Sequence, residues 1–319
     1  MPQEKTDTIE PVASPRAWPA RVPETAGVVL AYITCAIIWG TTWYAIRVCV
    51  SPSGFSPFLA AALRFTVAAL VFACMWPLGV VRAGNASGRN IAWLVVAGLL
   101  SSLGFGLVYT AERWVSGGMA AIISSTTPLM MAVVATVSRT ERVSRASVAG
   151  SLIALTGVLV IFQDSLQASS TQALAVLMLL GSVATSTVNN AILKHNTREQ
   201  NPMFSAAFYS LVCGLVFWLL AAVVERRPVA WPVPLVPSLA VVYLGIFGSV
   251  TAFVAYFYLL KRVRLMTIST LVFYPPLIAL GVDALLEKSF TPTPGTYLAM
   301  GITLLGVGVS LFGPRGGRF

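Results

Sequence analysis

Two adjacent asparagines, Asn189 and Asn190, lie inside a long apolar stretch of the 319-residue sequence. A carboxamide that faces lipid has unsatisfied polar groups, so at least one of the two should face other parts of the protein. There it could hydrogen-bond the ammonium or the carboxylate of a zwitterionic small molecule. It could equally join two helices, a common role of amides in membrane proteins. The sequence leaves both roles open.

Prolines interrupt two other apolar stretches, at Pro128 and at the pair Pro275 and Pro276. A proline inside a helix leaves the carbonyl four residues earlier without its partner, and for Pro128 this is the carbonyl of Ser124. Within a membrane such backbone is tolerated where protein groups or a water-filled cavity satisfy it. A neighbouring hydroxyl, such as that of Thr127, could therefore replace the missing partner without any cavity.

Six aromatic side chains in the apolar stretches would together form a wall with polar tips, suited to a partly apolar small molecule. Aromatic residues at helical spacing more often serve packing alone, so each one singly is weak evidence for a site. The six are Trp39, Trp43, Tyr109, Tyr256, Phe273 and Tyr274.

One arginine, Arg64, also lies inside an apolar stretch, about 10 Å along its helix from the nearer end at 1.5 Å per residue. Its side chain could extend to the membrane surface. Alternatively it could face inward and hold a substrate carboxylate, a backbone carbonyl or an acidic partner, because a charge within the membrane is a candidate functional group.

Acidic groups are missing from the middle of every apolar stretch; Asp283 and Glu112 lie near stretch ends. A proton-driven exporter of lipophilic cations usually needs such a buried acid, so neutral or zwitterionic cargo is favoured.

The sequence has no GxxxxGK[ST] loop for nucleotide hydrolysis, and its lone histidine, His195, is expected in a solvated loop. Without a His, Asp or Glu cluster at one depth, an intramembrane lipid-modifying enzyme is a remote alternative. No filter-like segment or charged pore ring indicates a channel.

The elements that carry these residues are membrane-spanning helices. The chain is 57% hydrophobic and 10% charged, with a mean hydropathy of +0.82, whereas soluble domains have about 45–50% apolar and about 25% charged residues. This excludes a soluble globular enzyme, a disordered chain and a secreted disulfide scaffold. A net charge of +10 could suggest nucleic acid, but the basic residues lie in short loops between apolar stretches, so no nucleic-acid partner is expected.

Ten stretches have the roughly 20 apolar residues that a transmembrane helix needs, which predicts an all-α integral membrane protein. A polar N-terminal tail (1–27) and a short C-terminal tail (313–319) flank them. The predicted spans are 28–50, 57–79, 90–110, 117–138, 146–163, 172–193, 203–224, 237–260, 266–286 and 294–312.

The distribution of lysine and arginine sets the expected orientation. With the N-terminus in the cytoplasm, fifteen of the 21 basic residues lie in inner segments and five in outer ones, and Arg64 is the remaining one. This bias predicts a multi-pass protein of the bacterial inner (plasma) membrane with both termini cytoplasmic.

The chain also resembles itself. A shift of 145 residues aligns 57–72 with 202–217, and a shift of 147 aligns Pro128 with Pro275. Two five-helix repeats, 28–163 and 172–312, follow from these matches. Because five is odd, the repeats must cross the membrane in opposite senses, the common plan of secondary transporters with a central substrate site.

Under the shift of 147, Thr42 and Trp43 correspond to Asn189 and Asn190, which adds Thr42 to the candidate residues. The corresponding prolines favour a role in lining a cavity, and they could serve as bending points for alternating access.

The segment from Trp39 to Arg47, and the segment from Pro57 to Phe65 that contains Leu63-Arg64-Phe65, resemble signatures of the EamA-type family of the drug/metabolite transporter superfamily. The resemblance covers residues 28–312. It implies a ten-helix inner-membrane permease, often an exporter of amino acids and related metabolites, and it makes Arg64 a family feature with a structural role. Further matching positions are Glu141-Arg142-Val143-Ser144, Gly150 and Gly157, followed by Pro275, Glu287 and Gly306 in the second half.

We therefore expect a non-enzymatic permease that exports small neutral or zwitterionic metabolites such as amino acids, with the lipid bilayer and a small-molecule substrate as partners. Export of drugs or other metabolites is the alternative, and carriage of nucleotide sugars is less expected. No cofactor and no metal are expected, and a homodimer is left open. The predicted substrate-binding residues are Trp39, Thr42, Trp43, Tyr109, Ser124, Thr127, Pro128, Asn189, Asn190, Tyr256, Phe273, Tyr274 and Pro275, with Arg64 and Pro276 as structural or gating residues.

Overall fold

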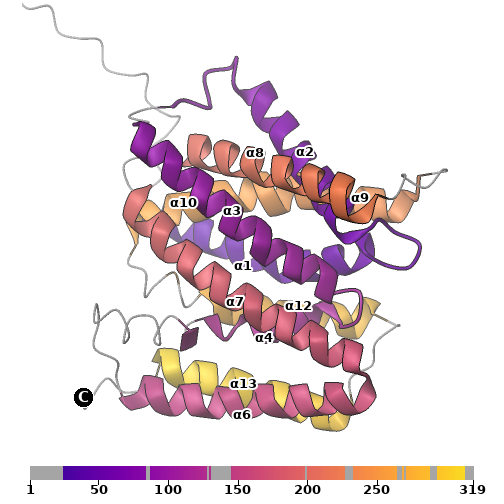
Figure 1. Ribbon diagram of the computed structural model, residues 1–319. Helices are drawn as coiled ribbons and strands as arrows, with labels where there is room; N and C mark the ends of the chain where they lie inside the picture. Colours follow the sequence, from indigo (N-terminus) through magenta and orange to yellow (C-terminus); the bar gives the residue numbers. More distant parts are fainter. Residues whose placement is uncertain are drawn as a thin grey trace, which may run out of the picture.

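The computed structural model describes residues 24–83, 87–127, 129–130, 145–197, 200–226, 233–263, 268, 271–287 and 293–312. Every regular element in these ranges is helical, and a helix lies within each of the ten predicted spans (Figure 1). The α-helices are α1 (Glu24–Cys49), α2 (Pro57–Met75), α3 (Gly88–Ala111), α4 (Gly117–Ser124), α6 (Arg145–Ala168), α7 (Ser170–Asn196), α8 (Pro202–Leu220), α9 (Leu235–Tyr243), α10 (Ala252–Arg262), α12 (Tyr274–Leu286) and α13 (Pro294–Phe312).

Shorter helical segments continue several of these helices. The π-helix η1 (Ala221–Glu225) extends α8, the π-helix η2 (Leu244–Thr251) joins α9 to α10, and the 3₁₀-helix η3 (Leu271–Phe273) precedes α12. Six stretches of the described chain are long and apolar enough to cross a membrane, and three shorter apolar helices accompany them. The all-helical membrane fold is thus confirmed.

Local residue chemistry sets the helix starts. The side chains of Ser87, Ser116 and Ser169 accept hydrogen bonds from backbone N–H groups of the first turns of α3, α4 and α7, respectively. α2 and α8 both begin with proline, Pro57 and Pro202, a residue whose missing N–H costs nothing in the first turn. The two helices that the 145-residue shift equates therefore begin in the same way.

The prediction of a proline kink within the ninth span is wrong. Pro275 and Pro276 occupy the first turn of α12, where the N–H groups would have no helical partner in any case. The chain changes from 3₁₀ to α geometry there, rather than bending within one helix. Pro128 lies outside the described residues. The carbonyl of Ser124 accepts a hydrogen bond from the Thr127 hydroxyl at 2.7 Å, so a side chain does satisfy the backbone at this point.

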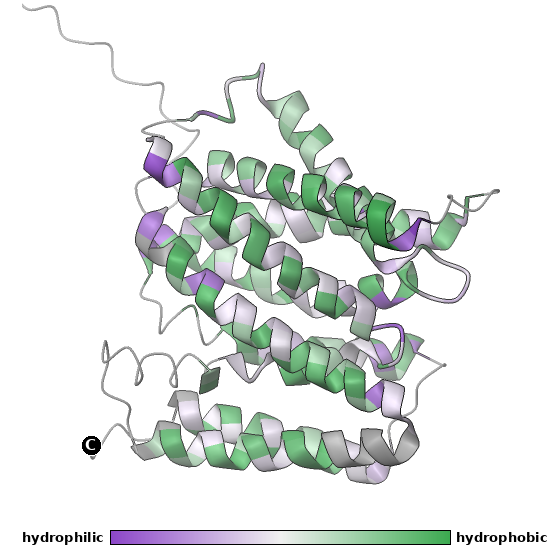
Figure 2. Ribbon diagram, viewed as in Figure 1, coloured by the Kyte–Doolittle hydropathy of each residue, from purple (hydrophilic) through white to green (hydrophobic). Residues whose placement is uncertain are grey.

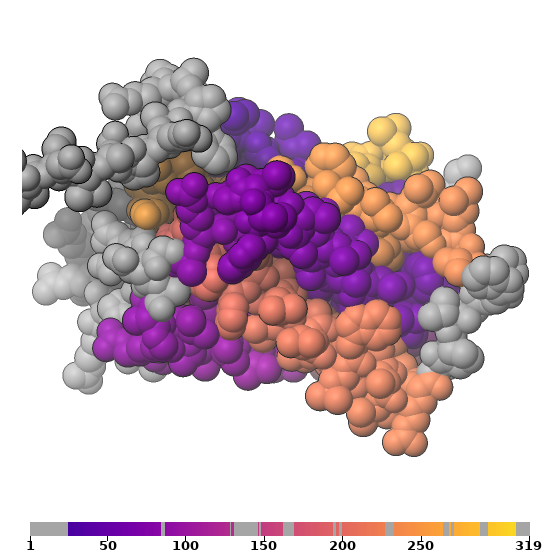
Figure 3. Space-filling model, turned by 90° about the horizontal axis from the view of Figure 1, so that it is seen from above, coloured from indigo at the N-terminus to yellow at the C-terminus, as the bar shows by residue number. Residues whose placement is uncertain are grey.

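Helices from the two halves of the chain pack against one another throughout the bundle. α1 packs on α10 and α12, α2 on α8, and α3 on α7 and α8, while α6 and α13 lie side by side at one edge (Figure 1). Seen from above, segments from early in the chain lie directly against segments from its second half (Figure 3).

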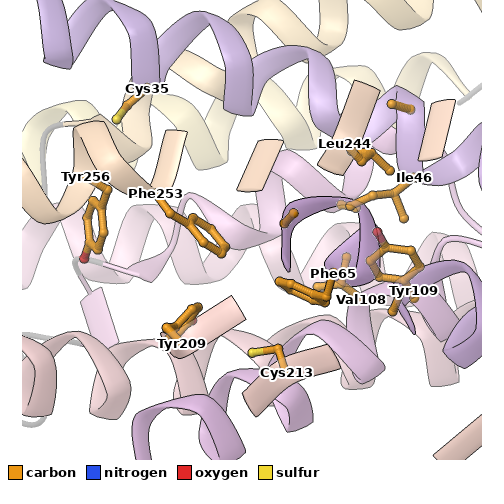
Figure 4. Packing of buried hydrophobic residues seen from close by; sticks show 14 of the residues in the cluster. Cys35, Ile46, Phe65, Val108, Tyr109, Tyr209, Cys213, Leu244, Phe253 and Tyr256 are labelled. Carbon is orange, nitrogen blue, oxygen red and sulfur yellow. The ribbon is translucent and has the colours of Figure 1, made fainter. Parts of the chain in front are cut away.

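Apolar residues dominate the helices, and hydrophilic residues lie mainly toward helix ends (Figure 2). Large apolar side chains such as Leu30, Leu215 and Leu305 are more than 60% exposed, as expected for a surface that contacts lipid. Inside, aromatic rings from three helices pack together. Phe65 of α2 stacks on Phe217 of α8 with centroids 5.9 Å apart. Phe253 of α10 contacts both Phe65 and Tyr209 of α8 (Figure 4). These rings form an aromatic core between α2, α8 and α10.

Candidate functional site

A cavity of about 240 Å³ lies at the centre of the bundle, between α1, α2, α3, α4, α7, α8, α10 and α12. Most of the predicted site residues line it. They are Trp39, Thr42, Trp43, Arg64, Ser124, Thr127, Asn189, Asn190, Tyr256, Pro275 and Pro276.

Three of the predicted residues lie elsewhere. Tyr109 is fully buried behind the cavity wall, where its hydroxyl accepts a hydrogen bond from Nη1 of Arg64 at 3.3 Å. Tyr274 is 42% exposed, with its ring against Tyr32 at a centroid distance of 5.9 Å, and Phe273 packs near Gly308 of α13. Because successive residues of a helix point about 100° apart, a turn that directs Pro275 into the cavity turns its two predecessors away.

Arg64 faces the protein interior rather than the membrane surface and is only 2% exposed. Its Nε donates to the Ser249 hydroxyl at 2.8 Å, and its Nη2 donates to the Gly248 carbonyl at 3.1 Å. Its guanidinium also lies 5.1 Å from the ring centroid of Phe105. All these partners are neutral. Within the described chain Arg64 lines the cavity without forming an ion pair.

Two of the three acceptors of Arg64 come from η2, whose π-helical turns interrupt the regular backbone pattern between α9 and α10. Insertions of this kind often occur at functional sites because they redirect backbone and side-chain groups. Here the insertion presents both a carbonyl and a hydroxyl, from consecutive residues, to a single guanidinium.

The two asparagines have different partners. Asn190 Oδ1 accepts a hydrogen bond from the Tyr256 hydroxyl at 2.9 Å, and the Tyr256 ring in turn lies 5.2 Å from that of Trp39. Asn189 Nδ2 donates to the Ser101 hydroxyl at 3.0 Å, and that hydroxyl also hydrogen-bonds Tyr209. Asn189 Oδ1 is buried and has no hydrogen-bond partner among the described residues. This acceptor belongs to a residue that lines the cavity.

Sequence reasoning missed several lining residues, although three of them lie at a helical spacing that the sequence shows. Ser182 and Ser186 precede the asparagines on α7 at helical spacing, and Leu193 continues the same face. A stripe at positions 182, 186, 189 and 193 is what one cavity-facing side of a helix requires. The other missed lining residues are Ile46, Ser101, Gly104, Phe105, Val108, Ala121, Val183, Tyr209, Phe253, Phe257, Ile268, Leu271 and Val272.

A second polar region was also missed. Arg47, Glu112, Asp283 and Glu287, which the sequence distributes over the ends of three spans, lie together just beyond the cavity. Arg47 Nε is 3.6 Å from Glu287 Oε2, and Arg47 Nη1 donates to the backbone carbonyl of Glu112 at 3.0 Å. The sequence placed Asp283 and Glu112 near stretch ends, as observed, but it revealed no acidic cluster because it does not show which span ends are neighbours in space.

A bundle of membrane-spanning helices around a central cavity, with several polar side chains in its mainly apolar lining, is typical of a membrane transporter. Comparison with known proteins identifies the family to which the chain belongs. The model of the EamA-like transporter family matches residues 25–163 and again residues 173–312. The chain belongs to the EamA-like transporter family.

Its relatives are named accordingly. Protein PagO of Salmonella typhimurium is 25% identical over 79% of this chain and 82% of its own length. The inner membrane transporter YedA of Escherichia coli K12 is 27% identical over 85% of this chain and 86% of its own length, and a transporter of Archaeoglobus fulgidus is 25% identical over 84% and 93%. A crystal structure that is 20% identical superposes with a TM-score of 0.63 over 92% of this chain and 99% of the other, which shows a shared fold.

Proposed function

We propose that this protein is an inner-membrane secondary transporter that exports small zwitterionic metabolites, such as amino acids, by alternating access. The observation that carries the proposal is the central cavity, enclosed by helices from both halves of the chain. Its volume of about 240 Å³ is below the range of about 300–1,000 Å³ typical of sites for drug-sized ligands. A cavity of this size suits a metabolite of a few heavy atoms better than a large drug.

The charges and polar groups of the cavity favour a zwitterion. Arg64 is the one charged side chain among its described lining residues, and it has no carboxylate partner there. Burying an uncompensated cation is costly, so a substrate carboxylate would supply the missing counter-charge. The Asn189 Oδ1 acceptor without a partner could receive an ammonium N–H, and aromatic rings such as Trp43 could contact an apolar side chain.

The mechanism rests on the internal duplication. The family model matches two consecutive segments, each with five of the predicted spans, and repeats of odd number enter the membrane in opposite orientations. Such inverted repeats can exchange conformations around a fixed central site. Cytoplasmic termini follow from the distribution of basic residues, and the export direction follows from the family resemblance. Transport, rather than catalysis, is accordingly the proposed activity.

Counterflow in proteoliposomes tests the substrate class. Vesicles loaded with one unlabelled amino acid should accumulate the labelled form, and empty vesicles should not. An amino acid should compete about 10- to 100-fold better than its carboxamide or its N-acetyl derivative, because hydrogen bonds to charged groups contribute about 1.5–3 kcal/mol.

Substitution of Arg64 then connects this preference to the cavity. Arg64→Gln should abolish the discrimination between carboxylate and carboxamide, and Arg64→Lys should keep part of it because it retains the charge. Arg113→Gln is the matched control, since Arg113 is exposed and outside the cavity. Counterflow of lipophilic cations but of no amino acid would refute the proposed substrate class.

A further inference from the structure

The charged cluster of Arg47, Glu112, Asp283 and Glu287 contains three carboxyl groups and one guanidinium. Arg47 lies near the end of α1, Glu112 directly follows α3, Asp283 lies in the last turn of α12, and Glu287 directly follows it. The loops after α1 and α3 lie at the same end of the bundle in Figure 1. If all three carboxyl groups were ionised, the cluster would carry two uncompensated negative charges.

Two of these carboxylates have electrostatic support. Glu287 lies beside Arg47, at 3.6 Å between Oε2 and Nε. Asp283 Oδ2 accepts a hydrogen bond from the backbone N–H of Gly118 at 2.7 Å, in the first turn of α4. The N-terminus of a helix favours a negative charge, so this carboxylate has a partner suited to its ionised form.

Glu112 has no such support. It is completely buried, and neither of its carboxyl oxygens has a hydrogen-bond partner in the described part of the chain. Arg47 donates to the backbone carbonyl of Glu112, not to its side chain. An ionised carboxylate in this position would lose its hydration without compensation, which costs several kcal/mol, whereas a protonated one avoids most of that cost.

Glu225, which is only partly buried, provides a contrast. It also ends a helical segment, and its carboxylate accepts hydrogen bonds from the Ser56 hydroxyl and from the backbone N–H groups of Phe58 and Leu59, at 2.9 and 3.1 Å, respectively. The Glu225 carboxylate therefore has three hydrogen-bond donors at the start of α2. Glu112 differs because neither of its carboxyl oxygens accepts a hydrogen bond from the described residues.

The cluster also lies next to one end of the cavity. Ile46 and Val108 line the cavity, and they precede Arg47 and Glu112 by one residue and by one helical turn. The cluster connects α1, α3 and α4, from the first segment that the family model matches, to α12 from the second. Opening of the cavity at this end would separate α12 from α1 and α4, on which it packs.

We propose that Glu112 is a proton-binding site of this transporter, distinct from the substrate cavity, and that its proton holds this end of the cavity closed. Loss of the proton to solvent places a third negative charge beside Asp283 and Glu287, with the guanidinium groups of Arg47 and Arg64 as the nearby positive charges. The resulting repulsion favours separation of α12 from α3. The proton-binding half of this inference does not depend on the proposed substrate.

The groups around Glu112 agree with a proton as the ligand. Burial raises the pKa of the Glu112 carboxyl well above its ordinary value; Asp283 and Glu287 raise it further, and Arg47 and Arg64 lower it by a smaller amount than burial raises it. In the described ranges no three His, Cys, Asp or Glu side chains are placed to hold a metal ion. The titratable and charged groups that face Glu112 are Arg47 and Cys49 of α1, Arg64 of α2, Tyr109 of α3, and Asp283 and Glu287 at the end of α12.

The first experiment measures the thermal unfolding midpoint of the purified full-length protein in detergent. A group whose pKa is raised in the folded state contributes stability at low pH and loses it as the pH rises through the folded pKa, so the midpoint should fall between about pH 5 and about pH 9. Glu112→Gln, a neutral mimic of the protonated form, should remove most of this fall. Glu225→Gln is the matched control and should leave the fall in place.

If the unfolding midpoint of Glu112→Gln falls with pH as much as that of the wild type, the proton site is overturned. It is also overturned if sodium ions, added without a change of pH, reduce the fall equally in Glu112→Gln and Glu225→Gln. If Glu112→Gln does not fold, infrared spectra of the wild type and Glu112→Asp decide instead. A protonated-carboxyl band in the wild type at neutral pH, shifted in Glu112→Asp, supports the site, and the absence of the band refutes it.

The second experiment tests closure. Cysteine introduced by Ile46→Cys, in a chain whose four native cysteines are replaced by alanine, is labelled with a maleimide at several pH values. Its labelling rate, divided by that of a chain that keeps only the exposed Cys74, should rise with pH and approach about tenfold over its acidic value. Adding Glu112→Gln should keep the ratio low at every pH. A ratio independent of pH in the chain with Glu112 would overturn the closing role, and it would leave the transport proposal untouched.

Discussion

Two pairs of neighbouring helices use small residues for different purposes. Between α6 and α13 the backbones touch: a Cβ atom at Gly306 would lie 2.6 Å from the carbonyl oxygen of Gly150, and one at Gly157 would lie 2.6 Å from that of Ala299. Between α3 and α7, a Cβ at Gly104 would meet the hydroxyl of Thr185 at 2.9 Å. The first pair is closed by backbone contact, and the second is lined by side-chain hydroxyls.

The difference follows the position of the cavity. Small residues allow membrane helices to approach closely, and van der Waals contact then holds the pair together. The pair α6 and α13 lies at the edge of the bundle (Figure 1) and contributes no described residue to the cavity. The pair α3 and α7 is joined by the Ser101–Asn189 hydrogen bond and leaves space beside it for the cavity. Glycine therefore allows close backbone packing between α6 and α13, whereas between α3 and α7 it leaves room for the cavity.

The largest effect is expected for Gly306→Leu. Its side chain would have to enter a contact made of backbone atoms, including the nitrogen of Ala154, which cannot move aside as a flexible side chain can. Overpacking typically costs about 1–3 kcal/mol and occasionally more, and at this rigid contact we expect loss of most of the folded protein. Size-exclusion chromatography and thermal unfolding in detergent measure it.

Gly301→Leu on the same helix is the control, because nothing lies within 4 Å of a Cβ there. It should retain wild-type yield and unfolding midpoint. Equal stability of the two variants would show that α6 and α13 are not in backbone contact.

Gly104→Leu should have the opposite profile. The new side chain meets the hydroxyls of Thr185 and Ser186, which can rotate, and it can occupy cavity volume. The unfolding midpoint should fall less than in Gly306→Leu, while counterflow of the transported amino acid should drop at least about tenfold, equivalent to 1.4 kcal/mol of lost substrate affinity. Wild-type counterflow in this variant would show that the substrate does not occupy the space beside α3.

The helices and much of the cavity could be predicted from the sequence. Apolar length locates membrane spans because the bilayer thickness fixes it. Trp39, Trp43, Asn189 and Asn190 were identifiable because polar and aromatic tips within a span must meet protein groups or a cavity.

The remainder depends on three-dimensional detail that no residue pattern carries. Phe273 and Tyr274 face away from the cavity because Pro275 begins a helix instead of kinking one, which rotates every side chain of that turn. The Ser249 and Gly248 acceptors of Arg64 depend on the π-helical register of η2. Glu112 and Asp283 are far apart in sequence, and only the packing of α1 and α4 against α12 brings them into one cluster.

The smallest effect is expected for Asn190→Ala, which is compared with a second asparagine of α7. Removal of the carboxamide leaves the Tyr256 hydroxyl without its acceptor, and a hydrogen bond contributes about 0.5–1.5 kcal/mol. The apparent affinity in counterflow should therefore weaken about two- to tenfold, with little change in folded yield, because Asn190 lies on the cavity face rather than in a backbone contact. Asn196→Ala is the matched control: the Asn196 side chain donates to the Ile192 carbonyl of its own helix and lies outside the cavity. If both variants weaken affinity equally, the effect belongs to α7 as a whole, and the assignment of Asn190 to the substrate site is wrong.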